Sequence, residues 1–148
     1  MRIKEHPLFK TPLAHRGLHN LKIDENSMPA FEAAVKAGFG IELDVHVTID
    51  DKIVVIHDTT TTRTTGVEKV VNESTYKELK KLKLLSTKTE IPLLRDVLKM
   101  VDGRVPILVE VKAENYIPSS LVSEVLKVVG EYPHKETLML QSFNPYVV

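Results

Sequence analysis

The sequence contains no cysteine among its 148 residues. This absence excludes disulfides and thiolate metal sites, so any metal ion must be bound by oxygen or imidazole ligands. A chain without cysteine fits a reducing compartment, and we therefore expect a cytoplasmic protein.

Long apolar stretches are also missing. Residues 1–12 mix charged and apolar side chains and lack the apolar core of a signal peptide. No segment approaches the ~20 apolar residues that a membrane-spanning helix needs. We expect no stable insertion into a membrane.

The chain has no excess of charge of either sign. Twenty basic residues balance twenty acidic residues, so the formal net charge is zero. This balance gives no basic footprint for nucleic acid and no acidic tail, and we expect no nucleic-acid partner. It is still compatible with a local positive pocket. The length suits one ordinary domain with a sizeable core.

Short apolar stretches alternate with segments of helical spacing. Strands are expected at 13–17, 40–48, 52–57, 105–112 and 137–142, and helices at 28–38, 74–84, 92–100 and 117–130. The connection between the second and third strands is too short for a helical crossover, so these strands are joined tightly. The alternation predicts an α/β fold with mostly parallel strands. In such folds the chemistry gathers at the carboxyl ends of the strands.

The second expected strand has an acidic face. Glu42 and Asp44 are two residues apart, so their side chains point to the same side of the strand. His46 shares that face but lies further along the strand, so it either belongs to the site or only lines its rim. A solvated edge strand would show the same alternation, but a carboxylate pair at this spacing is also able to hold a divalent cation.

The fourth expected strand repeats the pattern with Glu110 and Lys112. An acid and a lysine that point inward from an apolar strand are costly unless they are paired or bound to a metal. One interpretation is therefore a structural ion pair. The other is a metal site, in which Glu42, Asp44 and Glu110 form an oxygen cage for Mg²⁺ or Ca²⁺.

Further polar residues stand at strand ends. Arg16 and Lys112 supply positive charge for an anionic group, and arginine matches phosphate oxygens in a bidentate manner. His15 and His57 titrate near neutrality and suit acid/base catalysis. Together with a metal, these groups are what phosphodiester cleavage requires. Asn26 either caps the first helix or reaches this site.

Ordered motifs across nearly the whole chain resemble the glycerophosphodiester phosphodiesterase family. Each motif is weak alone, but their order and spacing are specific. The matching segments are His15-Arg16-Gly17, Glu25-Asn26-Ser27-Met28-Pro29-Ala30-Phe31, Glu42-Leu43-Asp44-Val45, Val54-Val55-Ile56-His57-Asp58, Arg63-Thr64-Thr65-Gly66, Ile91-Pro92-Leu93-Leu94, Glu110-Val111-Lys112 and Gln141-Ser142-Phe143-Asn144.

The resemblance implies a TIM-like (β/α)₈ barrel with a small insertion after the third strand, at about 59–90. It implies metal-dependent hydrolysis of glycerophosphodiesters to an alcohol and glycerol 3-phosphate, and thus a place in lipid and glycerol metabolism. It also implies a set of site residues. They are the acid/base pair His15 and His57, the metal ligands Glu42, Asp44 and Glu110, the phosphate-side cations Arg16 and Lys112, and the site-lining Asn26.

Length is where the chain departs from the family. A (β/α)₈ barrel typically needs ~250 residues, whereas this chain offers about five strands. We therefore expect residues 1–148 to form a single partial barrel domain, with open edges that favour self-association. Two alternatives to the diesterase follow. One is a truncated, catalytically inactive half-barrel that binds metal or phosphate or assembles with another chain. The other is a related phospholipase-D-type lipid hydrolase, although the mostly polar loops favour it less.

Overall fold

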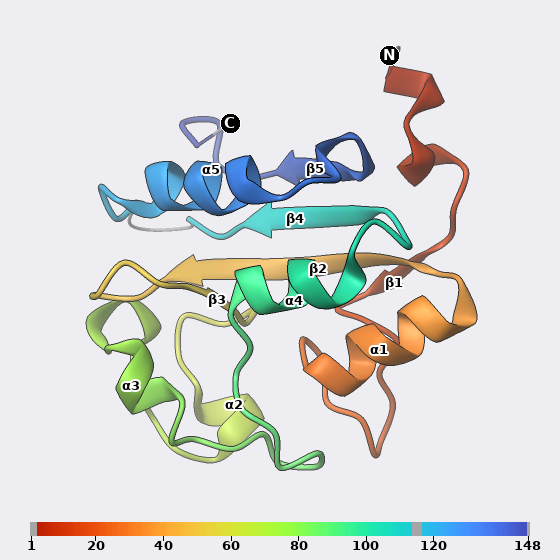
Figure 1. Cartoon of the computed structure of the whole chain (residues 1–148). Coiled ribbons are helices and arrows are strands. Elements are labelled where there is room, and N and C mark those ends of the chain that lie inside the picture. The colour runs from red at the N-terminus through yellow and green to blue at the C-terminus, as the bar shows by residue number, and fades with distance from the viewer. Residues whose placement is uncertain (1–2, 114–116, 148) are drawn as a thin grey trace.

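The computed structural model describes residues 3–113 and 117–147, and its strands form one five-stranded sheet. Four strands are parallel in the order β1-β2-β4-β5, and β3 pairs antiparallel with β2 (Figure 1). The strands are β1 (Leu13–His15), β2 (Gly40–Val47), β3 (Ile53–Val55), β4 (Ile107–Val111) and β5 (Leu138–Gln141). The predicted α/β fold and the tight β2–β3 connection are confirmed.

The longer helices lie on one face of this sheet (Figure 1). They are α1 (Met28–Ala37), α4 (Leu94–Val101) and α5 (Leu121–Glu131). Short 3₁₀ helices occupy Ile3–Glu5, Pro7–Phe9, Val71–Glu73 and Lys135–Thr137. The main hydrophobic core fills the space between sheet and helices.

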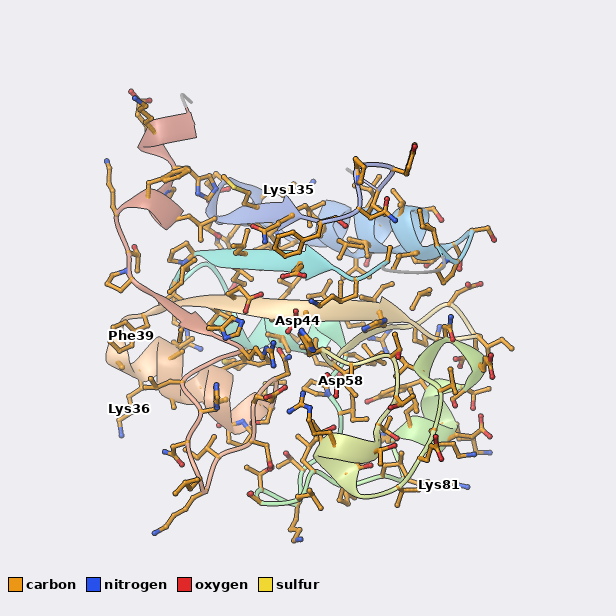
Figure 2. The ribbon with its side chains drawn as sticks, turned by 180° about the vertical axis from the view of Figure 1, so that it is seen from behind. Lys36, Phe39, Asp44, Asp58, Lys81 and Lys135 are labelled. Atoms are coloured by element: carbon orange, nitrogen blue, oxygen red, sulfur yellow. The ribbon has the colours of Figure 1, made fainter. Side chains whose placement is uncertain are left out.

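The central strand β2 shows how the sequence pattern decides which side chains face the core. Ile41, Leu43 and Val45 belong to the main core and are completely buried. The intervening Glu42 and Asp44 therefore point to the face away from the helices, because side chains alternate across a strand. Figure 2 labels Asp44 near the middle of the molecule.

Helix α1 begins and ends as the sequence predicts. Ser27 is the N-cap, and its hydroxyl accepts a hydrogen bond from the backbone N–H of Ala30 at 3.2 Å. Pro29 occupies the first turn, where its missing N–H costs nothing. Gly38 ends the helix in the left-handed conformation, with φ of 75°.

A separate, mostly irregular segment connects β3 to α4. This β3–α4 segment, residues 56–93, contains the short helices α2 (Thr62–Thr65) and α3 (Tyr76–Leu79). A second hydrophobic cluster holds it together, and its buried members include Ile56, Leu79 and Leu84. The segment lies beyond the carboxyl end of β3, in the lower left of Figure 1.

The expected helix over 74–84 is wrong beyond Leu79. The chain turns there, and the backbone N–H of Leu84 donates to the carbonyl of Thr89 at 2.9 Å. This turn buries Leu84 in the second cluster, which a continuous helix would not do. The segment 58–72, for which the sequence predicts neither a helix nor a strand, contains the single turn of α2.

Two other helices begin later than predicted. The carbonyl of Pro92 accepts a hydrogen bond from the N–H of Val55 at 2.8 Å, so the chain is still extended there and α4 begins at Leu94. Residues 117–120 precede α5, which begins at Leu121. Among the helices of the described residues, none is long and apolar enough to cross a membrane.

Candidate active site

Strand register brings the predicted site residues to one end of the sheet. His15 on β1 pairs with Glu42 on β2, and Asp44 pairs with Glu110 on β4. His15 and Glu110 lie at or near the carboxyl ends of β1 and β4, and their partners Glu42 and Asp44 lie beside them on the longer strand β2. In open and closed α/β folds this is the end where ligands bind.

Three carboxylates converge at this end. Glu42, Asp44 and Glu110 are buried, and each offers a ligand oxygen within 4.8 Å of the others. Burial, together with the negative charge of Asp44, raises the pKa of Glu42 above its ordinary value. Buried carboxylates that repel one another match the hard oxygen ligands that Mg²⁺ and Ca²⁺ prefer, so these residues fit a divalent cation.

Lys112 is the positive charge closest to this cluster. Its Nζ lies 2.6 Å from Glu110 Oε1 and 3.3 Å from Asp44 Oδ1. Burial opposes its charge, but the hydrogen bond to Glu110 and the charge of Asp44 outweigh burial and raise its pKa. The structural ion pair that the sequence allowed for Glu110 and Lys112 is present, and it is part of the carboxylate cluster.

Arg16 and Asn26 reach the cluster from the loop between β1 and α1. The backbone N–H of Arg16 donates to Glu42 Oε2 at 3.0 Å, and its Nε lies 3.5 Å from Asp44 Oδ2. Asn26 is buried, and its Nδ2 donates to Asp44 Oδ2 at 2.9 Å. Of the two interpretations of Asn26, the structure therefore supports contact with the site, while Ser27 caps the helix.

This loop is held in an unusual backbone conformation. Arg16 and Asn26 have φ of 57° and 49°, a region that non-glycine residues rarely adopt. The N–H of Asn26 donates to the carbonyl of Arg16 at 2.9 Å and ties the two residues together. Such strain persists only where the surroundings fix it, and it clusters at functional sites.

Gly17 allows the loop to pack closely against α1. Its φ is +81°, and a Cβ at this position would lie 2.8 Å from the Cβ of Ala30. Only glycine fits both the backbone conformation and the space. The close approach holds the neighbouring Arg16 against the strand ends.

The histidines occupy different surroundings. His15 is exposed, and its Nε2 lies 3.8 Å from Glu42 Oε2. His57 is half-buried, and its Nδ1 lies 2.7 Å from Asp58 Oδ1. His46 is buried, and its Nε2 lies 3.0 Å from the carbonyl oxygen of His57. His46 therefore supports the backbone beside His57.

Three further residues surround the site without a role assigned from the sequence. Glu25 accepts a hydrogen bond from Arg16 NH1 at 3.1 Å. Asp58 contacts His57, and Arg63 in α2 binds both Glu25 and Asp58. All three lie in segments that resemble the family's motifs, but neither spacing nor the resemblance assigned them a role.

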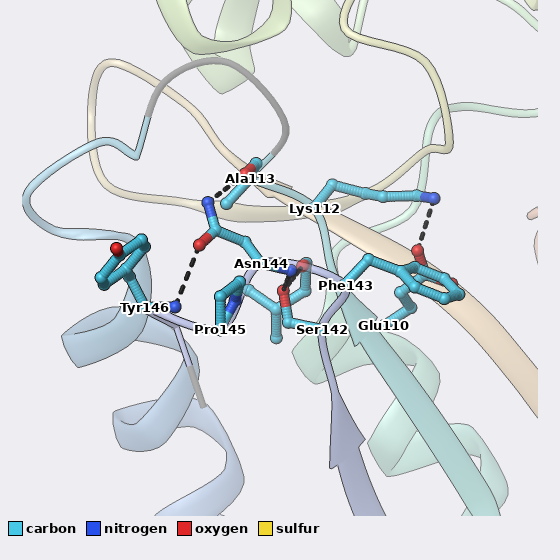
Figure 3. A pocket seen from close by; sticks show the side chains of 9 residues that line it. Glu110, Lys112, Ala113, Ser142, Phe143, Asn144, Pro145 and Tyr146 are labelled. Atoms are coloured by element: carbon cyan, nitrogen blue, oxygen red, sulfur yellow. Dashed lines mark hydrogen bonds and ion pairs between the residues drawn. The ribbon is translucent and has the colours of Figure 1, made fainter.

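A hollow adjoins the carboxylates at the ends of β4 and β5 (Figure 3). Glu110 and Lys112 line one side, and the segment after β5 lines the other. Phe143 and Tyr146 in that segment are largely exposed. Asn144 joins the two sides, because its Nδ2 donates to the carbonyl of Ala113 at 2.7 Å.

Comparison with known proteins agrees with this geometry. The family model described as the glycerophosphoryl diester phosphodiesterase family matches residues 15–148. The chain belongs to this family. A glycerophosphodiester phosphodiesterase of Caldanaerobacter subterraneus subsp. tengcongensis is 35% identical over an alignment of 142 residues that covers 90% of this chain and 58% of that protein. A lysophospholipase D of Rattus norvegicus is 34% identical over 137 residues, covering 84% of this chain and 43% of that protein.

Solved structures of the family share the fold. The glycerophosphodiester phosphodiesterase of Thermotoga maritima is 30% identical with a TM-score of 0.76, covering 93% of this chain and 55% of that chain. A phosphodiesterase of Oleispira antarctica, solved with its product sn-glycerol-3-phosphate, has a TM-score of 0.84 at 23% identity, over 95% of this chain and 61% of that one. The described strands and helices form part of a TIM-like (β/α)₈ barrel, as predicted. The chain spans little more than half the length of these glycerophosphodiester phosphodiesterases.

Proposed function

We propose that this chain is a metal-dependent phosphodiesterase that hydrolyses glycerophosphodiesters to an alcohol and glycerol 3-phosphate. The observation that carries the proposal is the convergence of the three buried carboxylates with Arg16 and Lys112 at one end of the sheet. Membership of the glycerophosphoryl diester phosphodiesterase family supports the substrate class. The Oleispira antarctica relative was solved with the product that this reaction would release.

Glu42, Asp44 and Glu110 are the residues that would hold Mg²⁺ or Ca²⁺. When bound, the cation supplies positive charge against the phosphate oxygens. Asn26 fixes the orientation of the Asp44 carboxylate through its 2.9 Å hydrogen bond.

Arg16 and Lys112 would bind the phosphate. Both cations already lie beside carboxylates of the cluster, which holds their side chains at the strand ends. A guanidinium suits two phosphate oxygens at once, whereas an ammonium acts as a point charge. In this assignment they orient the diester and offset its negative charge.

His15 and His57 would carry out acid/base catalysis. Hydrolysis breaks the bond between phosphorus and the alcohol oxygen, so one group must accept a proton from water and another must protonate the leaving alcohol. An imidazole that donates from Nδ1 to the carboxylate of Asp58 keeps Nε2 of His57 as its basic nitrogen.

A second candidate is hydrolysis of lysophospholipids with release of the headgroup alcohol. The relative from Rattus norvegicus carries the name lysophospholipase D. Phe143 and Tyr146 expose apolar surface at the hollow beside Glu110 and Lys112, where an acyl chain would find apolar contacts (Figure 3). This candidate uses the same carboxylates and cations and differs only in the substrate.

Product analysis separates the two candidates. The purified 148-residue chain is incubated with glycerophosphocholine, and in parallel with lysophosphatidylcholine, in the presence of Mg²⁺ or Ca²⁺. The proposal predicts choline and glycerol 3-phosphate from the first substrate. Preferred cleavage of the second would support the lipid hydrolase, and no cleavage of either by folded protein would reject both.

A histidine variant tests the assigned chemistry in the same assay. We expect His57→Ala to lower the rate on the order of 10²-fold or more, as for loss of a general acid or base. His19→Ala is the matched control, because His19 is exposed in the loop before α1. Equal rates for the two variants would remove His57 from catalysis.

Two expectations about organisation stay predictions. We propose that residues 1–148 are one partial barrel domain and that about 59–90 form an insertion after β3. The separate hydrophobic cluster of the β3–α4 segment supports this division. A cytoplasmic location is proposed from the lack of cysteine alone.

A further inference from the structure

The side chain of Arg63 joins two carboxylates that belong to different parts of the site. Its Nε and NH2 donate to Asp58 at 2.8 and 3.1 Å. Its NH1 and NH2 donate to Glu25 at 3.1 and 2.6 Å. Each carboxylate is therefore bound at two points, and a guanidinium is the side chain that has this fork geometry.

Each of these carboxylates in turn holds a residue of the proposed catalytic machinery. Asp58 Oδ1 lies 2.7 Å from Nδ1 of His57. Glu25 Oε1 lies 3.1 Å from NH1 of Arg16. Arg63 is thus linked through a single carboxylate to each of the proposed acid/base histidine and the phosphate-side arginine, His57 and Arg16.

Arg63 comes from outside the sheet. It lies in α2 of the β3–α4 segment, and Glu25 lies in the loop between β1 and α1. A second contact joins the same two regions, because Asp24 accepts hydrogen bonds from the backbone N–H groups of Ser86 and Thr87 at 3.1 and 2.7 Å. The segment is therefore anchored to the site loop at two points, at Arg63 and at Ser86 and Thr87.

An ordinary surface ion pair is the simpler explanation. About half of the Arg63 side chain is exposed, and exposed pairs usually contribute little to stability. Here, however, one guanidinium makes four hydrogen bonds with two carboxylates. Bonding of this kind adds little to stability, but it restricts the orientation of both carboxylates. A catalytic site requires groups that are held in a fixed orientation.

We propose that Arg63 is a positioning residue, which orients His57 through Asp58. The same guanidinium orients Arg16 through Glu25, so the β3–α4 segment sets the geometry of both sides of the site. This inference rests on the proposed function for its effect on rate. The effect on His57 itself follows from the contacts alone.

The ionisation of the two carboxylates supports this assignment. The hydrogen bonds from Arg63 hold the pKa of Asp58 at about 2. For Glu25, burial favours the neutral form, but the hydrogen bonds and charge of Arg63 outweigh burial and lower the pKa. Both acids are therefore ionised at neutral pH and act as acceptors.

Arg63→Gln tests the inference, with Arg95→Gln as the matched control. Arg95 is an exposed arginine on α4 whose ion-pair partner is its neighbour Asp96. We expect Arg63→Gln to lower kcat for glycerophosphocholine by ~10-fold or more, because a small misplacement of a catalytic group is costly. Arg95→Gln should stay within about twofold of the wild-type rate. Arg63→Lys keeps the charge but not the fork, so it should recover only part of the loss.

A spectroscopic measurement separates positioning from general damage. In ¹⁵N-labelled protein at neutral pH, the ring of His57 should carry its proton on Nδ1 in the wild type and in Arg95→Gln. That signal should shift or broaden in Arg63→Gln. Asp58→Asn should reproduce the rate loss, and the double variant should lose little more than either single variant.

The outcomes are distinct. A rate for Arg63→Gln equal to that of Arg95→Gln would overturn the inference, as would an unchanged His57 Nδ1 signal. If wild-type protein does not cleave the substrate, the proposed function fails, and the His57 signal still decides the role of Arg63. If Arg63→Gln does not fold, the rate and the His57 signal of Arg63→Lys are compared with those of Arg95→Gln instead.

Discussion

Glu42 shows at the scale of one residue why the site suits a cation. It is buried beside Asp44 and Glu110, and the lowered polarity and negative neighbours raise its pKa. Removing one of three like charges relieves repulsion, whereas binding a cation satisfies all three. We therefore expect a bound cation to stabilise the folded chain through these carboxylates.

Replacement of Glu42 by glutamine separates the repulsion between the carboxylates from the binding of a cation. Without metal, we expect Glu42→Gln to melt at or above the wild-type temperature, because a repulsive charge is gone. With Mg²⁺ or Ca²⁺, the wild type should gain stability, about 2.7 kcal/mol at a metal concentration one hundred times Kd. The variant should gain little or none.

Thermal melting with metal and with chelator measures this difference. Glu32→Gln is the control, since Glu32 lies on the exposed face of α1. A metal-induced shift in Glu42→Gln as large as that of the control would remove Glu42 from the ligand set.

Residues on strands were predictable from sequence to a greater extent than those on loops. Alternation alone placed Glu42 and Asp44 on one face, because strand geometry fixes the direction of every second side chain. Arg63 and Glu25 are 38 positions apart, and only the folded β3–α4 segment brings them together. The positive φ of Arg16 likewise depends on its contacts with Glu42 and Asn26.

At the scale of elements, the site depends on a loop and a segment that the sheet does not hold. The loop between β1 and α1 carries Arg16 and Asn26, and the β3–α4 segment carries Arg63. Charged hydrogen bonds of Asp24 and Glu25 join these regions. Protonation of the two carboxylates should therefore weaken this junction before the sheet unfolds.

The pH dependence of stability follows in part from Asp58, the other carboxylate bound by Arg63. The pKa of Asp58 falls from 3.8 to about 2 on folding, chiefly through the hydrogen bonds of Arg63. A lowered pKa stabilises the folded state above the unfolded pKa, and this contribution is lost as pH falls from about 4 to about 2. Because Arg63 is half exposed, we expect a contribution on the order of 1 kcal/mol.

Denaturant unfolding of the wild type and Asp58→Asn at pH 7, 4 and 2.5 checks this contribution. The variant should start less stable and lose less on acidification, so the two stabilities should converge. Asp96→Asn serves as the control for an exposed acid on α4. Parallel curves for wild type and Asp58→Asn would contradict the assignment.

Elements with a strong periodic pattern were predicted best. The helix that begins after Ser27 and the acidic strand β2 agree with the structure because caps and alternation are local signals. The helix expected over 74–84 ends at Leu79 because burial of Leu84 in the second cluster overrides local preference. Tertiary packing of this kind has no counterpart in the local sequence.

At the scale of the whole molecule, the sheet has unpaired edges among the described strands. β5 forms backbone hydrogen bonds with β4, and β1 with β2, while neither pairs on its other side. Unpaired edges favour pairing with another chain. We predict that the isolated 148-residue chain self-associates, and sedimentation velocity over a range of concentrations measures this. A monomer at every concentration would show that these edges do not pair.

The most direct test of the central claim is metal-dependent turnover by the whole chain. Metal is removed with a chelator, and Mg²⁺ or Ca²⁺ is then added back while calorimetry measures binding and an assay measures release of glycerol 3-phosphate from glycerophosphocholine. We predict binding near one ion per chain, with a rate that rises in proportion to occupancy and disappears in Glu42→Gln. Turnover that persists in the metal-free chain, or metal binding that leaves the rate at zero, would contradict the account.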